Sequence, residues 1–448
     1  MFKLISKSSG IELAKHSLPN ISDNDVLVET IASCYSKGTE SSTIKNHQKS
    51  IVSKIIGNKS KILELFSKGD FSQLLAKLNN QKLSVINLGY SASGRVLSKG
   101  KNVHDINIGD TVVVLGSSAN HSQFSIVPQG LCISIGDKVD PLDASAAAIA
   151  SIALNSVQLA NPMIGSKALV IGCGLLGQFV TQFLSLSGIS STCVDIEDWK
   201  FAQAKEHGAE SCLTLNEFIN ESISNKFDSI FIATPSIDIA TWRSIGQSSK
   251  FSAKILMLGA ADLNCPREIF YKKHLNFISP HSYGPGRGIY DFEIMNQDFP
   301  EIASTWDIRS NVRTFIKLLL SKKITTKFID TFVMDESSDD SLINALEDNK
   351  AYSVILDWRK LENKTENNEA MTFKKVDDIS PVYKNICIYG YSDFAKEAHI
   401  PSISNQNNLE LAGVFNRSPI KEGQVDIVDA KKLSSNSIGT IVISSNHG

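Results

Sequence analysis

The chain has 448 residues, 42% of them hydrophobic and 21% charged, with a formal net charge of −2 at pH 7. This length allows two or three domains with sizeable cores, and the near-neutral charge offers no basic field to nucleic acid or membrane lipid. The seven cysteines form no C-x-x-C pair, and the sequence shows neither a signal peptide nor an apolar run of transmembrane length, so we expect a cytoplasmic protein that does not span a membrane.

Residues 1–143 contain short runs in which apolar and polar residues alternate, separated by Gly, Asn and Asp. The clearest runs lie at 25–31, 94–97, 110–115 and 123–127. Alternation with a period of two is typical of strands with one buried face, so these residues predict a twisted β-rich domain.

The segment 45–82 differs from the runs around it. Its apolar residues, Leu65 and Phe66 among them, recur at helical spacing, and it carries eight lysines but only two acidic residues, Glu64 and Asp70. Two interpretations stay open: solvated helices inserted between strands, and a basic lid over an anionic substrate.

From residue 144 to residue 280, strand and helix patterns alternate. Apolar strand-like runs lie at 168–171, 191–194, 229–233 and 254–258. This alternation predicts a doubly wound parallel sheet, and the chain as a whole is therefore expected to be an α/β protein.

The turn after the first of these strands has the glycine spacing of a dinucleotide-binding site. Gly172 permits the tight bend, Gly174 lets backbone amides approach a pyrophosphate, and Gly177 allows the helix to pack closely on the strand. The helix begins with Leu175 and Leu176, so its N-terminus is expected to face the phosphates.

Asp195 ends the second strand, 23 positions after Gly172. A carboxylate at this place is expected to accept hydrogen bonds from both ribose hydroxyls and to repel a 2′-phosphate, so NAD is favoured over NADP. Thr234 and Gly259 follow later strands at the carboxyl edge of the sheet, where we expect their backbone to contact the cofactor.

Residues 281–360 begin with loops, continue with an amphipathic helix at 311–322, and end with two strands that we expect to return to the first domain. The polar segment 361–385 is typical of a linker. Residues 386–448 start a second strand–turn–helix unit. At about 60 residues this unit is less than half of a doubly wound domain, so it is either truncated or degenerate.

Four motifs together give the chain a family resemblance: Ser36–Glu40, Gly89–Val96, His281–Arg287 and Gly390–Pro401. Residues 1–360 resemble the medium-chain dehydrogenase/reductase superfamily. The whole chain resembles bacterial bi-domain oxidoreductases, in which such an enzyme is fused to a Gfo/Idh/MocA-type domain. The resemblance implies a GroES-like catalytic domain, a Rossmann domain and a partial second Rossmann unit at the C-terminus.

The sequence departs from the zinc members of that superfamily. Lys37 and Tyr90 stand where those members carry a Cys and a His as metal ligands, and 143–151, where a third ligand would fall, contains neither residue type. A catalytic zinc needs about three protein ligands, so no zinc is predicted, with Cys34 and His121 as stray candidates.

Without zinc, hydrogen-bond donors have to polarise the carbonyl or stabilise the alkoxide. Tyr90 is the first candidate for acid–base catalysis, with Lys37 expected near it to lower its pKa. The resemblance implies that Thr39 passes the substrate proton and that Glu40 is the adjacent acid. The alternative for each is structural, with Tyr90 packing in the cleft and the other two stabilising a turn.

Three more residues are candidates for the cleft. The resemblance implies that the loop with Asn120 and His121 borders it, although a satisfied surface histidine is the simpler interpretation. Arg287 suits a bidentate contact to a phosphate, a carboxylate or the cofactor, with a structural ion pair as the alternative.

The resulting hypothesis is a zinc-independent, NAD-linked oxidoreductase that acts on an alcohol or carbonyl, such as a sugar derivative in polysaccharide biosynthesis. The sugar rests on the resemblance to the fused domain alone. Two alternatives stay open: an NADPH-dependent quinone or enone reductase, and a non-catalytic nucleotide-binding scaffold. The expected partners are a small-molecule substrate and a second copy in a homodimer, with no nucleic acid and no membrane.

Overall fold

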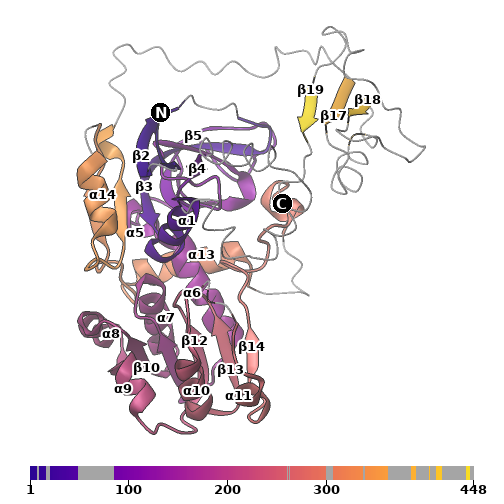
Figure 1. The fold of residues 1–448 in the computed structure, drawn as a ribbon. Coiled ribbons are helices and arrows are strands. Elements are labelled where there is room, and N and C mark those ends of the chain that lie inside the picture. The colour runs from indigo at the N-terminus through magenta and orange to yellow at the C-terminus, as the bar shows by residue number, and fades with distance from the viewer. Residues whose placement is uncertain are drawn as a thin grey trace. The chain divides into compact units, whose positions relative to one another are not determined.

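The computed structural model describes residues 1–7, 10–16, 21–48, 85–259, 261, 263–298, 306–336, 339–361, 385–389, 403, 410–415 and 440–443. The chain divides into two compact units, Met1–Asn363 and Lys364–Gly448 (Figure 1). Most of the basic segment 45–82 and nearly all of the expected linker lie outside the described residues.

The first unit contains a β-rich domain built around one long strand, β3. Its strands are β1 (Phe2–Lys7), β2 (Gly10–Lys15), β3 (Asp25–Tyr35), β4 (Ile86–Asn87), β5 (Ser91–Lys99), β6 (Thr111–Leu115), β7 (Phe124–Pro128) and β8 (Cys132–Ser134). Both β5 and β7 pair antiparallel with β3, and β5 continues through β6 to β8. A separate three-stranded sheet has the order β2-β1-β4.

The last segment of this unit completes the main sheet of the β-rich domain. It forms β15 (Asp330–Val333), α14 (Asp339–Glu347) and β16 (Val354–Asp357). β16 pairs antiparallel with β3, and β15 pairs parallel with β16, which makes a seven-stranded sheet. The chain therefore returns to the sheet where it began.

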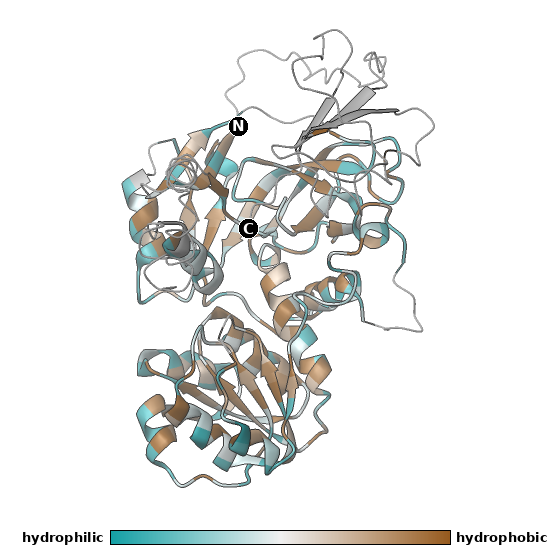
Figure 2. Cartoon of the chain, turned by 45° about the vertical axis from the view of Figure 1, so that its right-hand side comes forward, coloured by the Kyte–Doolittle hydropathy of each residue, from teal (hydrophilic) through white to brown (hydrophobic). Residues whose placement is uncertain are grey.

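A six-stranded parallel sheet forms the other half of the first unit. Its strands are β9 (Lys167–Ile171), β10 (Ser190–Asp195), β11 (Ala209–Thr214), β12 (Phe227–Ile232), β13 (Ser249–Met257) and β14 (Asn276–Ile278), in the order β11-β10-β9-β12-β13-β14. This is the doubly wound order, which reverses between β9 and β12. The inner strands are hydrophobic and buried, as in sheets covered by helices on both faces (Figure 2). The predicted α/β fold class is confirmed.

The helices connect these strands and join the two sheets. They are α1 (Lys37–Gln48), α5 (Pro141–Ala144), α6 (Ala147–Ala160), α7 (Leu175–Leu186), α8 (Phe201–Glu206), α9 (Leu215–Asn220), α10 (Ile239–Ser248), α11 (Arg267–Tyr271), α12 (Tyr290–Glu293) and α13 (Ile308–Leu320), with short 3-10 helices at Gln129–Leu131, Asp198–Lys200 and Arg359–Leu361. One hydrophobic core includes Val113 of β6, Ala148 of α6, Phe179 of α7 and Phe315 of α13. The β-rich and parallel-sheet domains are thus packed through α6, α7 and α13.

The second unit has three described strands, β17 (Asn385–Tyr389), β18 (Glu410–Phe415) and β19 (Thr440–Ile443). They are parallel and lie in the order β18-β17-β19. This is the arrangement that opens a doubly wound sheet, with the first strand between the second and the third.

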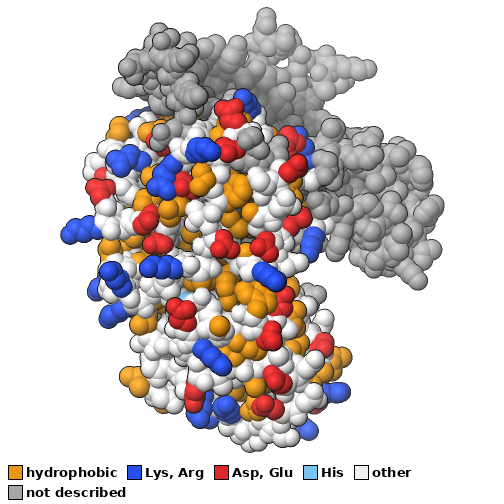
Figure 3. Space-filling model, turned by 90° about the vertical axis from the view of Figure 1, so that its left-hand side faces the viewer, with side chains coloured by type: hydrophobic (Ala, Val, Ile, Leu, Met, Phe, Trp, Pro, Cys, Tyr) orange, Lys and Arg blue, Asp and Glu red, His pale blue; other side chains and the backbone are white. Residues whose placement is uncertain are grey.

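Acidic and basic side chains are mixed over the face of the first unit drawn in Figure 3. None of the helices in the described residues is long and apolar enough to cross a membrane.

Candidate functional site

Two glycines shape the turn between β9 and α7. Gly172 has a φ of +97°, and a Cβ added there would lie 2.8 Å from Thr234 Cγ2. A Cβ added at Gly177 would lie 1.9 Å from the carbonyl oxygen of Gly172. Both positions therefore require glycine.

The third glycine of the motif faces open space. A Cβ added at Gly174 would have no heavy atom within 4 Å, and Gly174 is the N-cap of α7 without a side chain to cap the helix. The first-turn amides, those of Leu175, Leu176 and Gly177, have no acceptor within an α-helix. They carry the positive end of the helix dipole, so the backbone here fits the pyrophosphate of a dinucleotide.

Asp195 is buried at the end of β10 and holds this turn in place. Its Oδ2 accepts from Cys173 N at 2.6 Å, and its Oδ1 accepts from Glu197 N and Lys200 Nζ, both at 3.0 Å. A carboxylate has about four lone-pair sites, so these three donors leave one for a ligand. Bonds from this carboxylate to the ribose hydroxyls stay a prediction.

Lys200 was missed by the sequence reasoning. Its Nζ lies 3.0 Å from Asp195 Oδ1 and 2.8 Å from Glu197 Oε2. Burial opposes the charged form, but the bond to Glu197 and the charge of Asp195 outweigh it and raise the pKa of Lys200. The sequence signal that could have identified Lys200 is its place five positions after Asp195, the acid that ends the strand.

Thr234 and Gly259 meet at the carboxyl edge of the parallel sheet. A Cβ added at Gly259 would lie 2.2 Å from the carbonyl oxygen of Thr234, whose methyl group faces Gly172. The structure thus brings these two residues to the glycine turn, at the point where the strand order reverses and where ligands of such sheets bind.

The other candidates surround a buried carboxylate in the β-rich domain. Glu40, in the first turn of α1, is 4% exposed. Its Oε1 accepts from Ser36 N at 2.7 Å, and its Oε2 lies 3.0 Å from both Gly89 N and His121 Nε2. Because both oxygens are engaged by the protein, this arrangement favours the turn-stabilising interpretation of Glu40 over direct contact with substrate.

His121 is fully buried, which corrects the expectation of a surface histidine. Its Nδ1 lies 2.8 Å from Ser33 Oγ, which also accepts from Trp358 Nε1 at 2.9 Å. With Nε2–H donating to Glu40, Nδ1 is free to accept the Ser33 hydroxyl proton, so neutral imidazole satisfies every member. This series of hydrogen bonds ends at the Trp358 indole N–H, which can only donate. The series therefore keeps its protons in place and cannot relay one.

Tyr90 is partly exposed and lies close to Ser36, Thr39 and Glu40. Partial burial of the phenol raises the pKa of Tyr90 and the charge of Glu40 adds to the rise, whereas hydrogen bonding to the Ser36 and Thr39 hydroxyls offsets only part of it. Tyr90 therefore stays protonated at neutral pH. This is the reverse of the lowered pKa that the sequence suggested.

Lys37 does not act on Tyr90, and the expectation that it does was wrong. Its Nζ donates to the carbonyl oxygens of Asp348 and, at 2.9 Å, Ala351. These acceptors lie in the loop between α14 and β16, so Lys37 ties α1 to the returning segment. Burial lowers the pKa of Lys37 despite the charge of Asp348.

No group of three His, Cys, Asp or Glu side chains in the described part of the chain is arranged to hold a metal ion. Of the two stray candidates, His121 is committed to Glu40 and Ser33. Burial raises the pKa of the Cys34 thiol to about 12, with a further contribution from the charge of Glu40.

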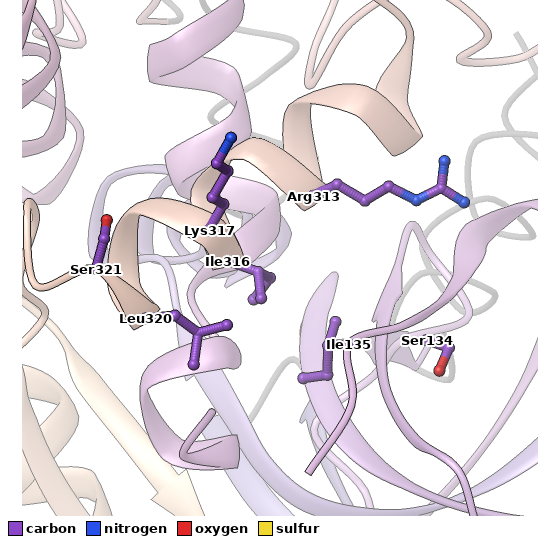
Figure 4. Close-up of a pocket in the computed structure, with 7 residues that line it drawn as sticks. All are labelled: Ser134, Ile135, Arg313, Ile316, Lys317, Leu320 and Ser321. Carbon is purple, nitrogen blue, oxygen red and sulfur yellow. The ribbon is translucent and has the colours of Figure 1, made fainter. Parts of the chain in front are cut away.

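Arg287 forms the structural ion pair that the sequence left as an alternative, with its Nη1 2.6 Å from Glu293 Oε1. A groove of about 560 Å³ lies between α13 and the end of β8 (Figure 4). Ile135 and Ile316 contribute to its lining, with Arg313 and Lys317 from α13. It contains none of the candidate residues, so we do not assign it to the site.

In the comparison with curated proteins, the chain is similar to D-guloside 3-dehydrogenase of Escherichia coli (strain K12), at 28% identity over 135 residues. The match covers 28% of this chain and 36% of that enzyme, so it spans only about a third of the relative's length. No family model matches the chain.

Solved structures match most of the chain. Galactitol-1-phosphate dehydrogenase from Escherichia coli has a TM-score of 0.58 at 16% identity, with 80% of this chain and 100% of that chain covered. A quinone oxidoreductase from Coxiella burnetii (TM-score 0.56, 15% identity) and a protein described as a short chain alcohol dehydrogenase from Escherichia coli CFT073, in complex with NADH (0.59, 16%), each cover 80% of this chain and 99% of their own. The chain therefore has the fold of medium-chain dehydrogenases, a GroES-like β-rich domain joined to a Rossmann sheet.

Proposed function

We propose that this chain is a zinc-independent, NAD-linked oxidoreductase that interconverts an alcohol and a carbonyl compound. The observation that carries the proposal is the glycine turn, where Gly172 and Gly177 are sterically required and Gly174 faces open space at a helix N-terminus. These features fit a dinucleotide pyrophosphate. The bound cofactor would supply the hydride acceptor or donor.

NAD is proposed over NADP because acidic side chains dominate the ribose end of the turn. Asp195, Glu197 and Asp198 lie together with one basic residue, Lys200. Lys200 is already shared between two of these carboxylates. The excess negative charge disfavours a 2′-phosphate.

We assign the proton chemistry to Tyr90. Its raised pKa keeps the phenol protonated, so Tyr90 Oη can donate a hydrogen bond to a carbonyl oxygen and release its proton as the alcohol forms. Thr39 is exposed and lies close to Tyr90, and we assign to it the exchange of that proton with solvent. Glu40 and Lys37 act indirectly, by holding the Gly89 turn and the loop after α14.

Zinc independence is supported by the donors at the two replaced positions. An ammonium and a protonated phenol stand where a thiolate and an imidazole would bind the metal. Elemental analysis should find well below one zinc per chain, and chelators should leave the Tm unchanged. Stoichiometric zinc would contradict this part of the proposal.

We further propose a sugar-derived substrate of polysaccharide biosynthesis, a cytoplasmic location and a homodimer. The substrate is supported by the partial match to D-guloside 3-dehydrogenase. It is also supported by the resemblance of 390–401 to the opening of a Gfo/Idh/MocA domain, with which the three parallel strands of the second unit are compatible.

The test begins with fluorescence titration of NADH and NADPH, followed by transfer of deuterium from labelled NADH to a panel of ketones and keto sugars, detected by mass spectrometry. We expect NADH to bind below millimolar concentration and more tightly than NADPH. Absence of NADH binding at millimolar concentration overturns the proposal. Tight NADH binding without turnover supports the alternative of a non-catalytic scaffold. NADPH-dependent reduction of a quinone or enone supports the alternative of a quinone or enone reductase.

A further inference from the structure

The groove between α13 and the end of β8 is built from two segments that lie far apart in the chain. Ser134 and Ile135 come from the end of β8 and the residue after it, and the other lining residues come from α13 and the residue after it. Ile316 is 5% exposed and belongs to the core that joins the two sheets, and Ile135 packs against that core. The base of the groove is therefore fixed by core packing.

The groove combines apolar surface with cationic side chains. Ile316 and Leu320 of α13 lie opposite Ile135, and the guanidinium of Arg313 extends to the side on which Ser134 lies (Figure 4). Leu320 is 46% exposed, so its side chain is accessible to a ligand. At about 560 Å³ the groove has the volume of small-molecule sites, which are mostly apolar with a few polar groups that fix the orientation of the ligand.

The two cations of the groove, Arg313 and Lys317, are exposed and have no acidic partner among the described residues. They lie four positions apart on α13, and like charges at this spacing repel each other on a helix surface. Arg309, one turn before Arg313, has a partner in Asp298. An anion bound beside Arg313 and Lys317 would reduce the repulsion and supply the missing partner.

We propose that this groove binds a small organic anion with an apolar chain, such as an alkyl phosphate, sulfate or carboxylate. The anionic group pairs with Arg313 and Lys317, and the chain lies on Ile135, Ile316 and Leu320. The ligand is a dissolved molecule and not a membrane lipid, because the apolar surface lies inside a groove of small-molecule size. None of the residues assigned to the proposed oxidoreductase site lines the groove, so this inference goes beyond the proposed function and does not depend on it.

Calorimetric titration of the full chain with octyl phosphate, below its micelle concentration, tests the proposal. We expect binding at submillimolar concentration. Inorganic phosphate, octan-1-ol and octyltrimethylammonium should each bind at least tenfold more weakly, because each lacks either the chain or the negative charge. Each buried methylene raises an affinity about fourfold, so butyl phosphate should also bind at least tenfold more weakly. Absence of octyl phosphate binding, or equal affinity for octyltrimethylammonium, overturns the proposal.

Variants place the binding in the groove. Arg313→Gln with Lys317→Gln should weaken octyl phosphate at least tenfold. Arg267→Gln with Lys272→Gln removes the same two charges from exposed positions at the ends of α11 and should stay within about twofold of wild type. Leu320→Ser should reduce the gain from butyl to octyl phosphate and leave the affinity for inorganic phosphate unchanged. Equal losses in the two double variants would show a general effect of net charge and would overturn the site.

Vesicles of phosphatidylglycerol and phosphatidylcholine separate a dissolved ligand from a membrane surface. We expect no sedimentation of the protein with them. Vesicle binding that requires Arg313 and Lys317 overturns the assignment to a dissolved ligand. If the Arg313 and Lys317 double variant loses its native Tm, the chain-length and charge series on wild type decides the proposal, because it needs no substitution.

Discussion

Two buried carboxylates, Glu40 in the β-rich domain and Asp195 in the Rossmann domain, each stabilise a glycine turn, but with different hydrogen-bond donors. Each accepts from two backbone amides and one side chain. Each holds a turn whose glycine, Gly89 or Gly172, has a φ of +97°. The third donor differs, because Asp195 is paired with a lysine and Glu40 with a histidine.

The origins of the donors also differ. Those of Asp195 lie 22, 2 and 5 positions away in the chain, whereas two of those of Glu40 lie 49 and 81 positions away. The proposed nucleotide site is thus assembled from one strand–turn–helix–strand unit, and the proposed tyrosine site from separate segments. A site built from one continuous unit can be recognised by the spacing of its residues in the sequence. A site built from separate segments cannot.

The most severe test on the Glu40 side is Tyr90→Phe, which removes only the hydroxyl. If Tyr90 is the proton donor, kcat should fall about 10²–10⁴-fold, because general acid catalysis contributes that much. The Kd for NADH should stay within about twofold, since no residue of the glycine turn is touched. A variant with full activity would return Tyr90 to a packing role.

Glu40→Gln keeps the size of the side chain but offers one oxygen to the three donors that now share two. At least one donor then loses its acceptor and meets an N–H group instead, so we expect a loss of about 3 kcal/mol in the free energy of unfolding. Chemical denaturation measures this loss. Glu12→Gln, at a partly exposed ion pair with Lys7, is the control and should change stability by less than about 1 kcal/mol. Equal effects of the two substitutions would show that the buried network is not a stabilising element.

The contrast between the two carboxylates explains what the sequence could and could not predict. The glycine motif could be named from the sequence because steric need fixes glycine at Gly172 and Gly177, at a spacing set by the strand and the helix. Asp195 could be named because it ends the next strand. The doubly wound sheet followed from alternating patterns of period two and 3.6.

The tyrosine site was predicted less well. Tyr90 and Glu40 were named, but Lys37 was placed beside Tyr90 when it bonds the loop after α14, and His121 was expected at the surface. These facts depend on pairing between segments up to 325 residues apart, such as Ser33 with Trp358. Sequence periodicity contains no record of such pairs.

A pH experiment probes the Asp195 side through a second buried histidine. His207 Nδ1 lies 2.7 Å from Gln178 Oε1, and Gln178 bonds the carbonyl oxygen of Cys173 in the glycine turn. Burial lowers the pKa of His207 from 6.5 to about 4, only partly offset by Glu206. Between these values the unfolded chain binds more protons than the native one, so stability is complete above pH 6.5 and falls as the pH drops toward 4.

From pH 7 to pH 5 this histidine should cost about 2 kcal/mol of unfolding free energy. His207→Gln should flatten that part of the stability profile, and His104→Gln, at an exposed histidine, should leave it as in wild type. The two profiles come from urea titrations at each pH. A wild-type slope that persists in His207→Gln would place the acid sensitivity elsewhere.

Asp195→Ala tests cofactor choice with a smaller expected effect. The substitution removes both a ribose acceptor and a charge that repels a 2′-phosphate, so NADH should bind about tenfold more weakly, a change of about 1.4 kcal/mol. The preference for NADH over NADPH should narrow at the same time. Asp198→Ala, at an exposed acid of the same segment, should change both affinities less. Unchanged selectivity in Asp195→Ala would place the ribose elsewhere.

The smallest expected effect concerns the second unit, and a null result is the prediction. Both carboxylate-centred turns and all of their donors belong to Met1–Asn363, the first compact unit. Limited proteolysis within 362–369 should therefore release the C-terminal unit while the remaining chain keeps its Tm and its Kd for NADH. Products cleaved within one of the two carboxylate-centred turns of residues 1–360 should lose both the native Tm and the affinity for NADH. Such products are the internal control. Loss of NADH affinity after cleavage at 362–369 alone would show that the second unit contributes to the nucleotide site, because no residue around Glu40 or Asp195 would have been removed.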